Sequence, residues 1–352
     1  MSDRLARDGV SVLVISGPGG VGKSAAAYEL SLLLQGRDIG HAVVDTDALD
    51  HLCPVPPDLP RLTEHNLAAI WESYRERGVS RLILTGVYLD RPAEMAWLKR
   101  AIPNAAFTFV RLLSGKDTLL ARVARRELGS GQAAQGERSA QQLAAMAADQ
   151  RPEVHELQTD DRSVTEIAGR LLARSGWGGE VSVRRATPDD ADAFADVHAR
   201  SWQVTYRGLV PDAVIEGVME GRAARVDLVR TMLAAADDPH HLFAAVEGEV
   251  LVGMAATAPA RDPDASAATG ELQAIYLAPE AIGRGIGRVL HDRALADLRE
   301  RGFTEATLWV LRENQRARHF YEAAGWQTDG ETKDEERPGG TLHEIRYRRA
   351  LT

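Results

Sequence analysis

Cysteine is nearly absent from this 352-residue chain, and so are long apolar runs. The single cysteine, Cys53, excludes an internal disulfide and a zinc site built from cysteines, and it fits a reducing compartment. No stretch reaches the roughly 18 uninterrupted apolar residues of a membrane helix, and residues 1–9 lack the apolar core of a secretion signal. These absences predict a cytoplasmic protein with no membrane partner.

Positive charge is also scarce, because 42 Lys and Arg stand against 51 Asp and Glu. Residues 1–176 hold 21 basic and 22 acidic residues, net −1, whereas residues 177–352 hold 21 and 29, net −8. An acidic surface disfavours nucleic acid as a partner and favours a cationic small molecule such as an amine. We therefore expect no nucleic-acid partner.

The length exceeds what one hydrophobic core usually supports, so two domains are expected. In the first half, strand patterns alternate with helical ones, which predicts a parallel sheet covered by helices in three αβα layers. The expected strands are residues 11–15, 41–44, 81–84 and 105–112, and the expected helices are 24–34, 62–77, 117–126 and 164–173. Residues 129–138 read as a loop. The turn-rich residues 175–180 separate two domains, 1–176 and 181–352.

A phosphate-binding pattern follows the first expected strand. Residues 17–24 match G-x-x-x-x-G-K-[ST] and open a helix, which is the context that this P-loop motif requires. The glycines let backbone amides surround phosphate oxygens, the lysine reaches the outer phosphates, and the serine can hold Mg²⁺. The predicted nucleotide-binding residues are Gly17, Gly19, Gly20, Gly22, Lys23 and Ser24.

Two carboxylates follow the second expected strand. Asp45 and Asp47 should emerge at the carboxyl edge of the sheet, beside the P-loop. They can hold Mg²⁺, with Asp45 and Ser24 as its ligands, or accept a substrate proton. The alternative is a plain turn with Asp47 as a helix N-cap.

These features together resemble the small-molecule kinases of the P-loop class, the shikimate, gluconate and adenylyl-sulfate kinase group. The resemblance implies ATP as a ligand, metal and acceptor roles for Asp45 and Asp47, and lid arginines over the nucleotide, for which Arg122 and Arg126 are candidates. A solvated helix face explains those arginines equally well. The third strand carries no Asp, so the usual metal-binding carboxylate there is missing.

A second strand, glycine-rich turn and helix occupies residues 271–301. Glycines at 283, 285 and 287 let the backbone approach a pyrophosphate, and two arginines add charge. The turn residues expected to bind a cofactor are Gly283, Arg284, Gly285, Ile286, Gly287 and Arg288. Such a turn alone is weak evidence, because it also occurs without an anion.

A strand at 307–311 and a helix at 314–325 follow, with Asn314, Ala317, Phe320, Tyr321 and Gly325 at the spacing N-x-x-A-x-x-F-Y-x-x-x-G-[FW]. This combination resembles the GNAT N-acetyltransferase family from residue 183 to residue 349. The resemblance implies a mixed, mostly antiparallel sheet, acetyl-CoA bound by Asn314, Ala317 and Phe320, and Tyr321 as the acid that protonates the departing thiolate.

Acetyl transfer needs a neutral amine, a polarised thioester carbonyl and an acid for the sulfur. Glu271 is the candidate base, through water, and its alternative is a solvated strand-end carboxylate. Tyr321 is the candidate acid, and its alternative is packing alone. The backbone amides of residues 275–277 can polarise the carbonyl. They belong to Ile275, Tyr276 and Leu277. Residues 329–340 read as a polar hairpin loop.

Three aromatic residues, Trp202, Tyr206 and Trp309, can line an acceptor pocket, although such residues are more often core. The favoured interpretation is a bifunctional enzyme, an acetyltransferase acting on a small amine such as an antibiotic or secondary metabolite, fused to an ATP-dependent kinase-like domain. Two alternatives stay open: a nucleotide-sensing P-loop domain that regulates the acetyltransferase, and a protein or peptide N-acetyltransferase. The sequence leaves the oligomeric state open, a homodimer included.

Overall fold

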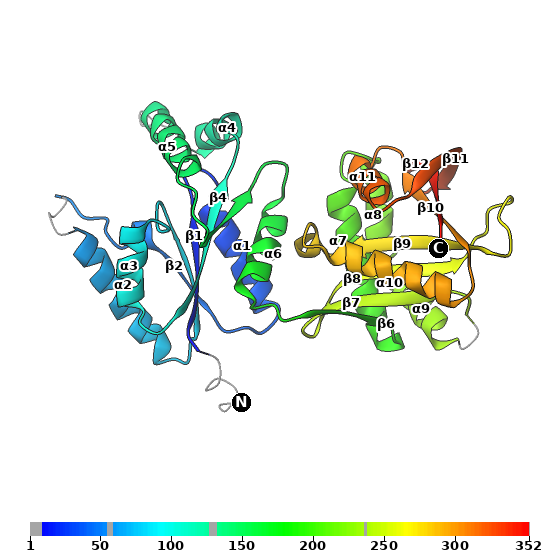
Figure 1. The fold of residues 1–352 in the computed structure, drawn as a ribbon, viewed down its shortest axis with the longest axis horizontal. Helices are drawn as coiled ribbons and strands as arrows, with labels where there is room; N and C mark the ends of the chain where they lie inside the picture. Colours follow the sequence, from blue (N-terminus) through cyan, green and yellow to red (C-terminus); the bar gives the residue numbers. More distant parts are fainter. Residues whose placement is uncertain (1–8, 55–58, 127–131, 236–237, 352) are drawn as a thin grey trace. The chain divides into compact units, whose positions relative to one another are not determined.

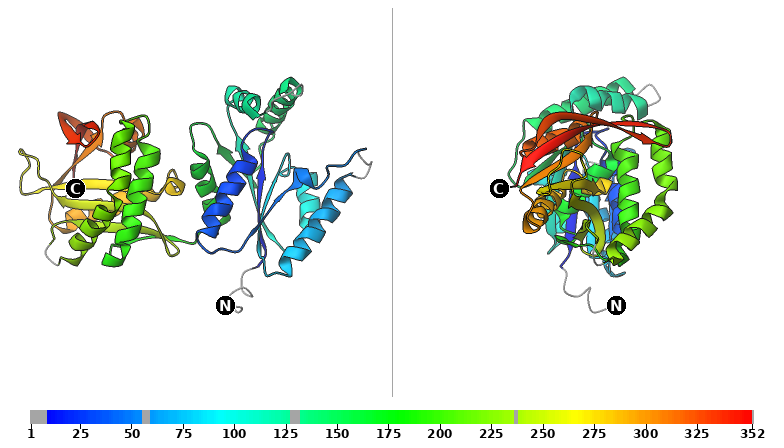
Figure 2. Two further views of the ribbon diagram at one scale, coloured as in Figure 1. Left: turned by 180° about the vertical axis from the view of Figure 1, so that it is seen from behind. Right: turned by 90° about the vertical axis from the view of Figure 1, so that its right-hand side faces the viewer.

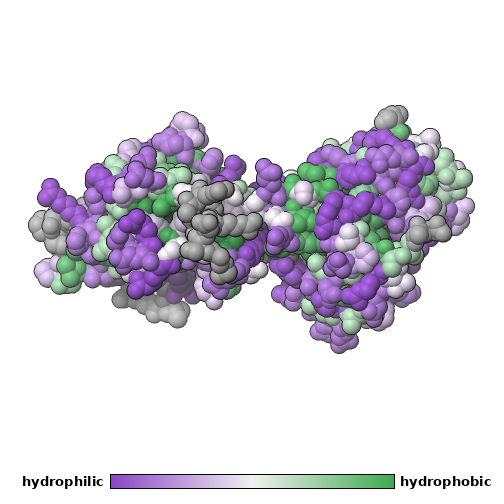
Figure 3. All heavy atoms as spheres, turned by 90° about the horizontal axis from the view of Figure 1, so that it is seen from below, coloured by the Kyte–Doolittle hydropathy of each residue, from purple (hydrophilic) through white to green (hydrophobic). Residues whose placement is uncertain are grey.

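The chain forms two compact units, Met1–Gly178 and Gly179–Thr352, each with its own sheet (Figure 1). The computed structural model describes residues 9–54, 59–126, 132–235 and 238–351. No helix in these ranges combines the length and hydropathy that crossing a membrane requires. Hydrophilic side chains cover most of the face of each unit drawn in Figure 3.

The first unit is built on a five-stranded sheet in the order β2-β3-β1-β4-β5, in which every pair is parallel. Its strands are β1 (Ser11–Ser16), β2 (Ala42–Asp45), β3 (Arg81–Gly86), β4 (Ala106–Leu113) and β5 (Val154–Gln158). The helices are α1 (Lys23–Gln35), η1 (Thr46–Ala48), α2 (Leu59–Arg75), α3 (Pro92–Ala101), α4 (Lys116–Arg126), α5 (Gln132–Ala147) and α6 (Val164–Ser175).

Alternation along β1 divides the core of this unit into two layers. Leu13 and Ile15 pack with α1 and α6, whereas Val12 and Val14 pack with α2 and α3 on the opposite face. This is the predicted three-layer α/β arrangement. The sequence missed α3 and β5. It was also wrong about residues 132–138, which begin helix α5, and the rest of that expected loop lies outside the described residues.

The second unit is built on a seven-stranded sheet in the order β11-β12-β10-β9-β8-β7-β6, in which only β9 and β10 pair in parallel. Its strands are β6 (Val181–Arg185), β7 (His241–Glu247), β8 (Val250–Pro259), β9 (Thr269–Leu277), β10 (Glu305–Leu311), β11 (Gln327–Arg337) and β12 (Gly340–Ala350). The helices are η2 (Pro188–Asp190), α7 (Ala191–Thr205), α8 (Asp212–Glu220), α9 (Arg222–Ala234), η3 (Pro279–Ala281), α10 (Ile286–Glu300) and α11 (Gln315–Ala323).

Helices cover both faces of this mixed, mostly antiparallel sheet. Helix α10 lies in front of it in Figure 1, and the reverse view in Figure 2 brings α7 and α9 to the front. Residues 329–337, expected as part of a loop, belong instead to strand β11, so that prediction was wrong. The turn lies at 338–339, where a Cβ added to Gly339 would come within 2.8 Å of Ala213 at the start of α8.

Candidate active site

Strands β9 and β10 run side by side for three residues and then separate. Their pairing begins at Thr269 with Glu305 and ends at Glu271 with Thr307, whereas β8 pairs with β9 as far as Leu277. Within the described chain, the backbone groups of residues 273–277 that point toward β10 therefore have no strand partner. The predicted carbonyl-polarising amides of residues 275–277 belong to this open segment.

The glycine-rich turn lies directly beyond the end of β9. Gly283 and Gly285 have φ of 73° and 86°, a left-handed conformation that glycine adopts without strain. Among the described residues, the amides of residues 283–287 donate to no backbone carbonyl, but the Arg288 amide already donates to Gly285. The turn and the first turn of α10 therefore present a row of unbonded N–H groups, which is the arrangement that binds an anion.

The Arg284 side chain does not face this turn. Its guanidinium is buried in an ion pair with Glu247, and the two side chains are 5% and 1% exposed. The expectation that this guanidinium adds charge to the anion site was therefore wrong, and only its backbone remains available. Arg288 lies beside the turn, with its guanidinium 5.6 Å from the centre of the Phe320 ring.

Helix α11 carries the predicted acid. The Asn314 side chain caps the helix by accepting a hydrogen bond of 3.0 Å from the Ala317 amide, which gives this residue a structural role beside its predicted contact with the cofactor. The Tyr321 ring packs edge-on against Phe320 and Trp326. Burial, and then the neighbouring Tyr276, raise the pKa of the Tyr321 phenol. The phenol therefore keeps its proton and can give it to a thiolate.

A single cavity of about 750 Å³ joins the strand gap and the glycine-rich turn to an aromatic pocket. Trp202 and Tyr206, from the end of α7, stack with ring centres 4.3 Å apart, and both line this cavity together with Trp309. Trp202 is also 4% exposed within a small apolar cluster, so it serves core and pocket at once. Ala317, Phe320 and Tyr321 line the cavity too.

Three carboxylates line the pocket, Glu271, Glu335 and Glu344, and two of them have raised pKa values. Burial raises the pKa of Glu271 on β9, and a hydrogen bond of 3.4 Å from Gln273 opposes this rise. Burial also raises the pKa of Glu344 on β12, opposed by an ion pair of 3.1 Å with Lys333. The sequence missed Glu344, although strict alternation on its strand puts it on the same face as the buried Leu342 and Arg346.

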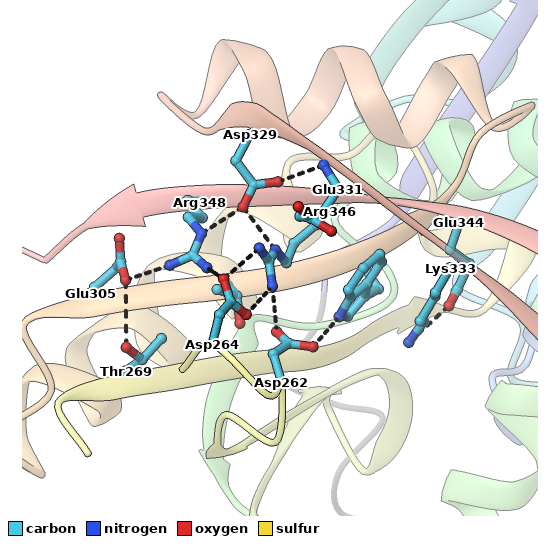
Figure 4. A network of polar contacts seen from close by, with 12 residues as sticks. Asp262, Asp264, Thr269, Glu305, Asp329, Glu331, Lys333, Glu344, Arg346 and Arg348 are labelled. Carbon is cyan, nitrogen blue, oxygen red and sulfur yellow. Dashed lines mark hydrogen bonds and ion pairs between the residues drawn. The ribbon is translucent and has the colours of Figure 1, made fainter. Parts of the chain in front are cut away.

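An ion-pair network fixes the wall that carries Glu344 (Figure 4). Arg346 is 4% exposed and pairs with Asp264 at 2.7 Å and Asp329 at 2.8 Å. Asp262, 3.4 Å from Arg346, also accepts a hydrogen bond of 3.0 Å from the Trp309 indole. These contacts tie the β8–β9 loop to β11 and β12, so the side chains of this wall are held in place before any ligand arrives.

In the first unit, residues 17–24, which match the P-loop pattern, connect β1 to the start of α1. Gly20 and Gly22 have φ of 84° and 105°. A Cβ at Gly17 would come within 2.7 Å of the Leu112 carbonyl oxygen, so this position requires glycine. The Lys23 ammonium donates to the carbonyl oxygens of Gly17 at 3.0 Å and Pro18 at 3.2 Å, and burial lowers its pKa. A buried ammonium folded over the loop can exchange these carbonyls for phosphate oxygens.

Both predicted carboxylates reach the P-loop. Ser24 donates to Asp45 at 3.2 Å, and Asp45 also accepts from the Asp47 amide at 3.2 Å. The N-cap of the short helix η1 is therefore Asp45, whereas the alternative of a plain turn had Asp47 as the N-cap. Partial burial raises the pKa of Asp47, and the nearby Lys23 lowers it. Lysine, hydroxyl and two carboxylates thus meet at the carboxyl edge of the sheet.

The two predicted lid arginines occupy different places. Arg122 is half-buried and braces the loop, donating to Thr159 Oγ1 at 2.8 Å and to the Val21 carbonyl at 3.3 Å. Arg126 lies close enough to Lys23 to lower the pKa of that ammonium. The Gly19 amide donates to Gln142 of α5 at 2.9 Å. Arg126 is therefore the better placed of the two arginines to meet a phosphate.

Comparison with known proteins assigns a family to the chain. Residues 210–326 match the acetyltransferase (GNAT) family. An uncharacterised N-acetyltransferase of Archaeoglobus fulgidus is 33% identical over 141 residues, which cover 40% of this chain and 89% of that protein. The chain belongs to the GNAT acetyltransferase family.

Individual relatives differ in what they acetylate. Mycothiol acetyltransferase of Beutenbergia cavernae is 34% identical over 176 residues, 47% of this chain, and the match spans only 56% of that relative's length. Spermidine N(1)-acetyltransferase of Thermoplasma acidophilum is 25% identical over 154 residues, 43% of this chain and 92% of that protein. Among solved structures, the PaiA N-acetyltransferase of Thermoplasma acidophilum in complex with coenzyme A is 20% identical with a TM-score of 0.40, covering 49% of this chain and 99% of that one.

Proposed function

We propose that the second unit, Gly179–Thr352, transfers the acetyl group of acetyl-CoA to the amine of a small molecule. The observation that carries this proposal is the single cavity into which the strand gap, the anion-binding turn, the Tyr321 phenol and two half-buried carboxylates all open. The membership of the chain in the GNAT family supports acetyl-CoA as the donor.

In this reaction the amine nitrogen attacks the thioester carbon, a C–N bond forms and the C–S bond breaks. A carboxylate, Glu271 or Glu344, takes the proton from the amine through water, and the Tyr321 phenol gives its proton to the departing thiolate. Open backbone amides in residues 275–277 hold the carbonyl oxygen as it gains charge. The amides of residues 283–287 bind the pyrophosphate of the donor and fix its position.

The test is release of thiol from acetyl-CoA across a panel of small amines, with a Tyr321→Phe variant. Loss of a general acid lowers the rate by roughly 10²–10⁴-fold, whereas the retained ring leaves packing unchanged. The matched control is Tyr347→Phe, because the Tyr347 hydroxyl hydrogen-bonds to Glu322 at 2.7 Å on a strand face that the cavity does not reach. That variant should lose stability and keep its activity. If Tyr321→Phe were as active as the wild-type enzyme, Tyr321 would not be the general acid.

A protein or peptide acceptor is the alternative for the same cavity. Turnover of peptides with none of small amines would replace the small-molecule proposal and leave the acetyl transfer intact.

We further propose that the first unit binds ATP or another nucleoside triphosphate with Mg²⁺ and transfers its terminal phosphoryl group. The meeting of Lys23, Ser24, Asp45 and Asp47 at one edge supports this. Among the described residues, no three His, Cys, Asp or Glu side chains form a metal-binding group, so Ser24 and Asp45 would hold Mg²⁺ together with phosphate oxygens and water. The ion would neutralise phosphate charge there.

ATP binding is measured by calorimetry with and without Mg²⁺, and phosphoryl transfer by ADP release. ADP release that rises when an acceptor is added supports the kinase. ATP binding without turnover, accompanied by a changed rate of acetylation, supports a nucleotide sensor instead.

A further inference from the structure

Arg225, on the wall of the acceptor pocket, has no carboxylate partner among the described residues. Arg225, half-buried on α9, lines the cavity, and its guanidinium forms no ion pair or hydrogen bond with any residue that the structure describes. The other arginines of this helix differ. Arg222 pairs with Asp196 at 2.6 Å, and Arg230 pairs with Asp192 at 3.1 Å, both on the outer side. The arginine that faces inward therefore lacks the carboxylate that its outward neighbours have.

A second guanidinium approaches the same wall from β11. One nitrogen of Arg337 pairs with Glu335 at 2.8 Å, but its Nε is buried and has no hydrogen-bond partner among the described residues. Both Arg225 and Arg337 line the cavity and lie near the same buried histidine, His198. Leaving a buried N–H unpaired costs free energy that a bound acceptor atom would recover.

His198 and Tyr276 line the same cavity, near both guanidinium groups. The rings of these residues meet edge-on with centres 4.8 Å apart. Burial, followed by the charges of Arg225 and Arg337, lowers the pKa of His198 to about 3, so the imidazole is neutral at any physiological pH. Burial raises the pKa of the Tyr276 phenol, and the charges of Arg225 and Arg337 oppose this rise while Glu344 adds to it. The Tyr276 ring therefore lies near two guanidinium groups and one carboxylate.

We propose that Arg225 and Arg337 form an anion subsite, and that the acetyl acceptor is an amine that also carries a carboxylate or phosphate group. This inference rests on the proposed acetyl transfer and deepens it. The amine would lie toward Glu344 and Glu271, and the acidic group would lie between the two guanidinium groups. A guanidinium binds carboxylate and phosphate oxygens through paired N–H donors, so either group suits the subsite.

The experiment compares acceptors that differ only in the acidic group. Amino acids are set against their carboxamides, and phosphoethanolamine against ethanolamine, with thiol release as the readout. The wild-type enzyme should prefer one acid-bearing series, and the series it prefers distinguishes carboxylate from phosphate. In Arg225→Gln, kcat/KM for the acid-bearing acceptor should fall by roughly 10–100-fold, mainly through KM, because a hydrogen bond to a charged group is worth about 1.5–3 kcal/mol. For the matched amine that lacks the acidic group, Arg225→Gln should leave kcat/KM unchanged.

Three controls keep the outcome clear. Arg225→Lys should restore part of the preference, and Arg230→Gln on the outer side of α9 should leave it unchanged. Arg337→Gln should weaken the same acceptors as Arg225→Gln. Binding of acid-bearing amines to the CoA-loaded protein, measured by calorimetry, needs no turnover.

Failure of the inference and failure of the proposed function look different. Amines that react with no preference for the acidic group, or an Arg225→Gln variant that slows both acceptors alike, would overturn the inference alone. An Arg225→Gln variant that binds CoA less tightly and keeps its acceptor preference would assign the arginine to the donor and also overturn it. No acetylation of any amine, with no binding of acid-bearing amines to the CoA-loaded protein, would overturn both.

Discussion

Removing the buried Arg111 guanidinium should lower the denaturant concentration at which the first unit unfolds. Asp90 and Arg111 are 0% and 1% exposed, and they form an ion pair of 2.5 Å. Asp90 also accepts a hydrogen bond of 2.6 Å from Ser16, the residue before the P-loop. This pair therefore links the end of β1 to β4 and holds the first glycine of the loop in position.

Arg111 and Asp90 differ in the hydrogen bonds that each makes outside the ion pair. Arg111 also donates to the carbonyl oxygens of Met146 at 2.7 Å and Asp149 at 2.6 Å, so it keeps hydrogen bonds when Asp90 is lost. Among the described residues, the Asp90 carboxylate would keep a side-chain hydrogen bond from Ser16 alone. Breaking a buried ion pair by removing one partner costs about 3–5 kcal/mol, and we expect Arg111→Met near the upper end. With a urea slope of about 2 kcal/mol/M, the midpoint should fall by roughly 2 M.

Urea titration followed by hydrogen exchange and mass spectrometry reports the two units separately. Arg111→Met should lower the protection of β1 and β4 and leave the second unit unchanged. Adding Asp90→Asn should recover part of the loss, because the carboxylate is no longer buried without its cation. Arg75→Met, which removes an exposed pair with Glu72, should leave the urea midpoint almost unchanged. A cost below about 1 kcal/mol for Arg111→Met, or no recovery in the double variant, would refute the reasoning.

Three further predictions concern the sites themselves. Burial raises the pKa of Glu271 and of Glu344, and a base must be ionised, so kcat/KM should rise with pH through a pKa above the usual carboxyl value. If Glu271 is the base, Glu271→Gln alone should remove this pH dependence, and the same holds for Glu344→Gln if Glu344 is the base. If the rise persists in both variants, neither residue is the base. Lys23→Met should abolish ATP binding in calorimetry and leave the affinity for acetyl-CoA unchanged; retained ATP binding contradicts the P-loop assignment. Arg284→Met should remove the buried ion pair with Glu247 and lower the stability of the second unit, seen as a lower Tm. An unchanged Tm would count against that ion pair.

The sequence predicted well those features that are set by neighbouring residues. The two glycine-rich turns and the start of α11 depend on backbone conformation within a few residues, so spacing alone located them. Helix α5 was mistaken for a loop because its buried face consists of small and polar residues, Gly136 and Ser139 with Met146, which give no apolar period. Strand β11 was mistaken for a loop because its residues are mostly exposed and polar, and it is a strand because it pairs with β12.

Contacts between distant segments could not be predicted in this way. Glu344 reaches the pocket because β12 lies between β10 and β11, and that strand order is a property of the whole sheet. Arg284 lies inside a recognisable motif, yet its direction is set by Glu247, which precedes it by 37 residues. A motif therefore locates the backbone of a site, and the side chains that complete the site depend on the rest of the fold.

The arginines of this protein show why charge alone is a poor guide to its sites. Only 4 of its 42 basic residues are lysines, so arginines supply most of the cations in its ion pairs. Arg111, Arg284 and Arg346 are each buried against carboxylates, and Arg122 braces the P-loop through Thr159. The proposed phosphate sites of the two units therefore depend on backbone amides and on Lys23. Arg225 differs from these three buried arginines because it lines the cavity and has no carboxylate partner among the described residues, which is why we propose that its partner belongs to a ligand.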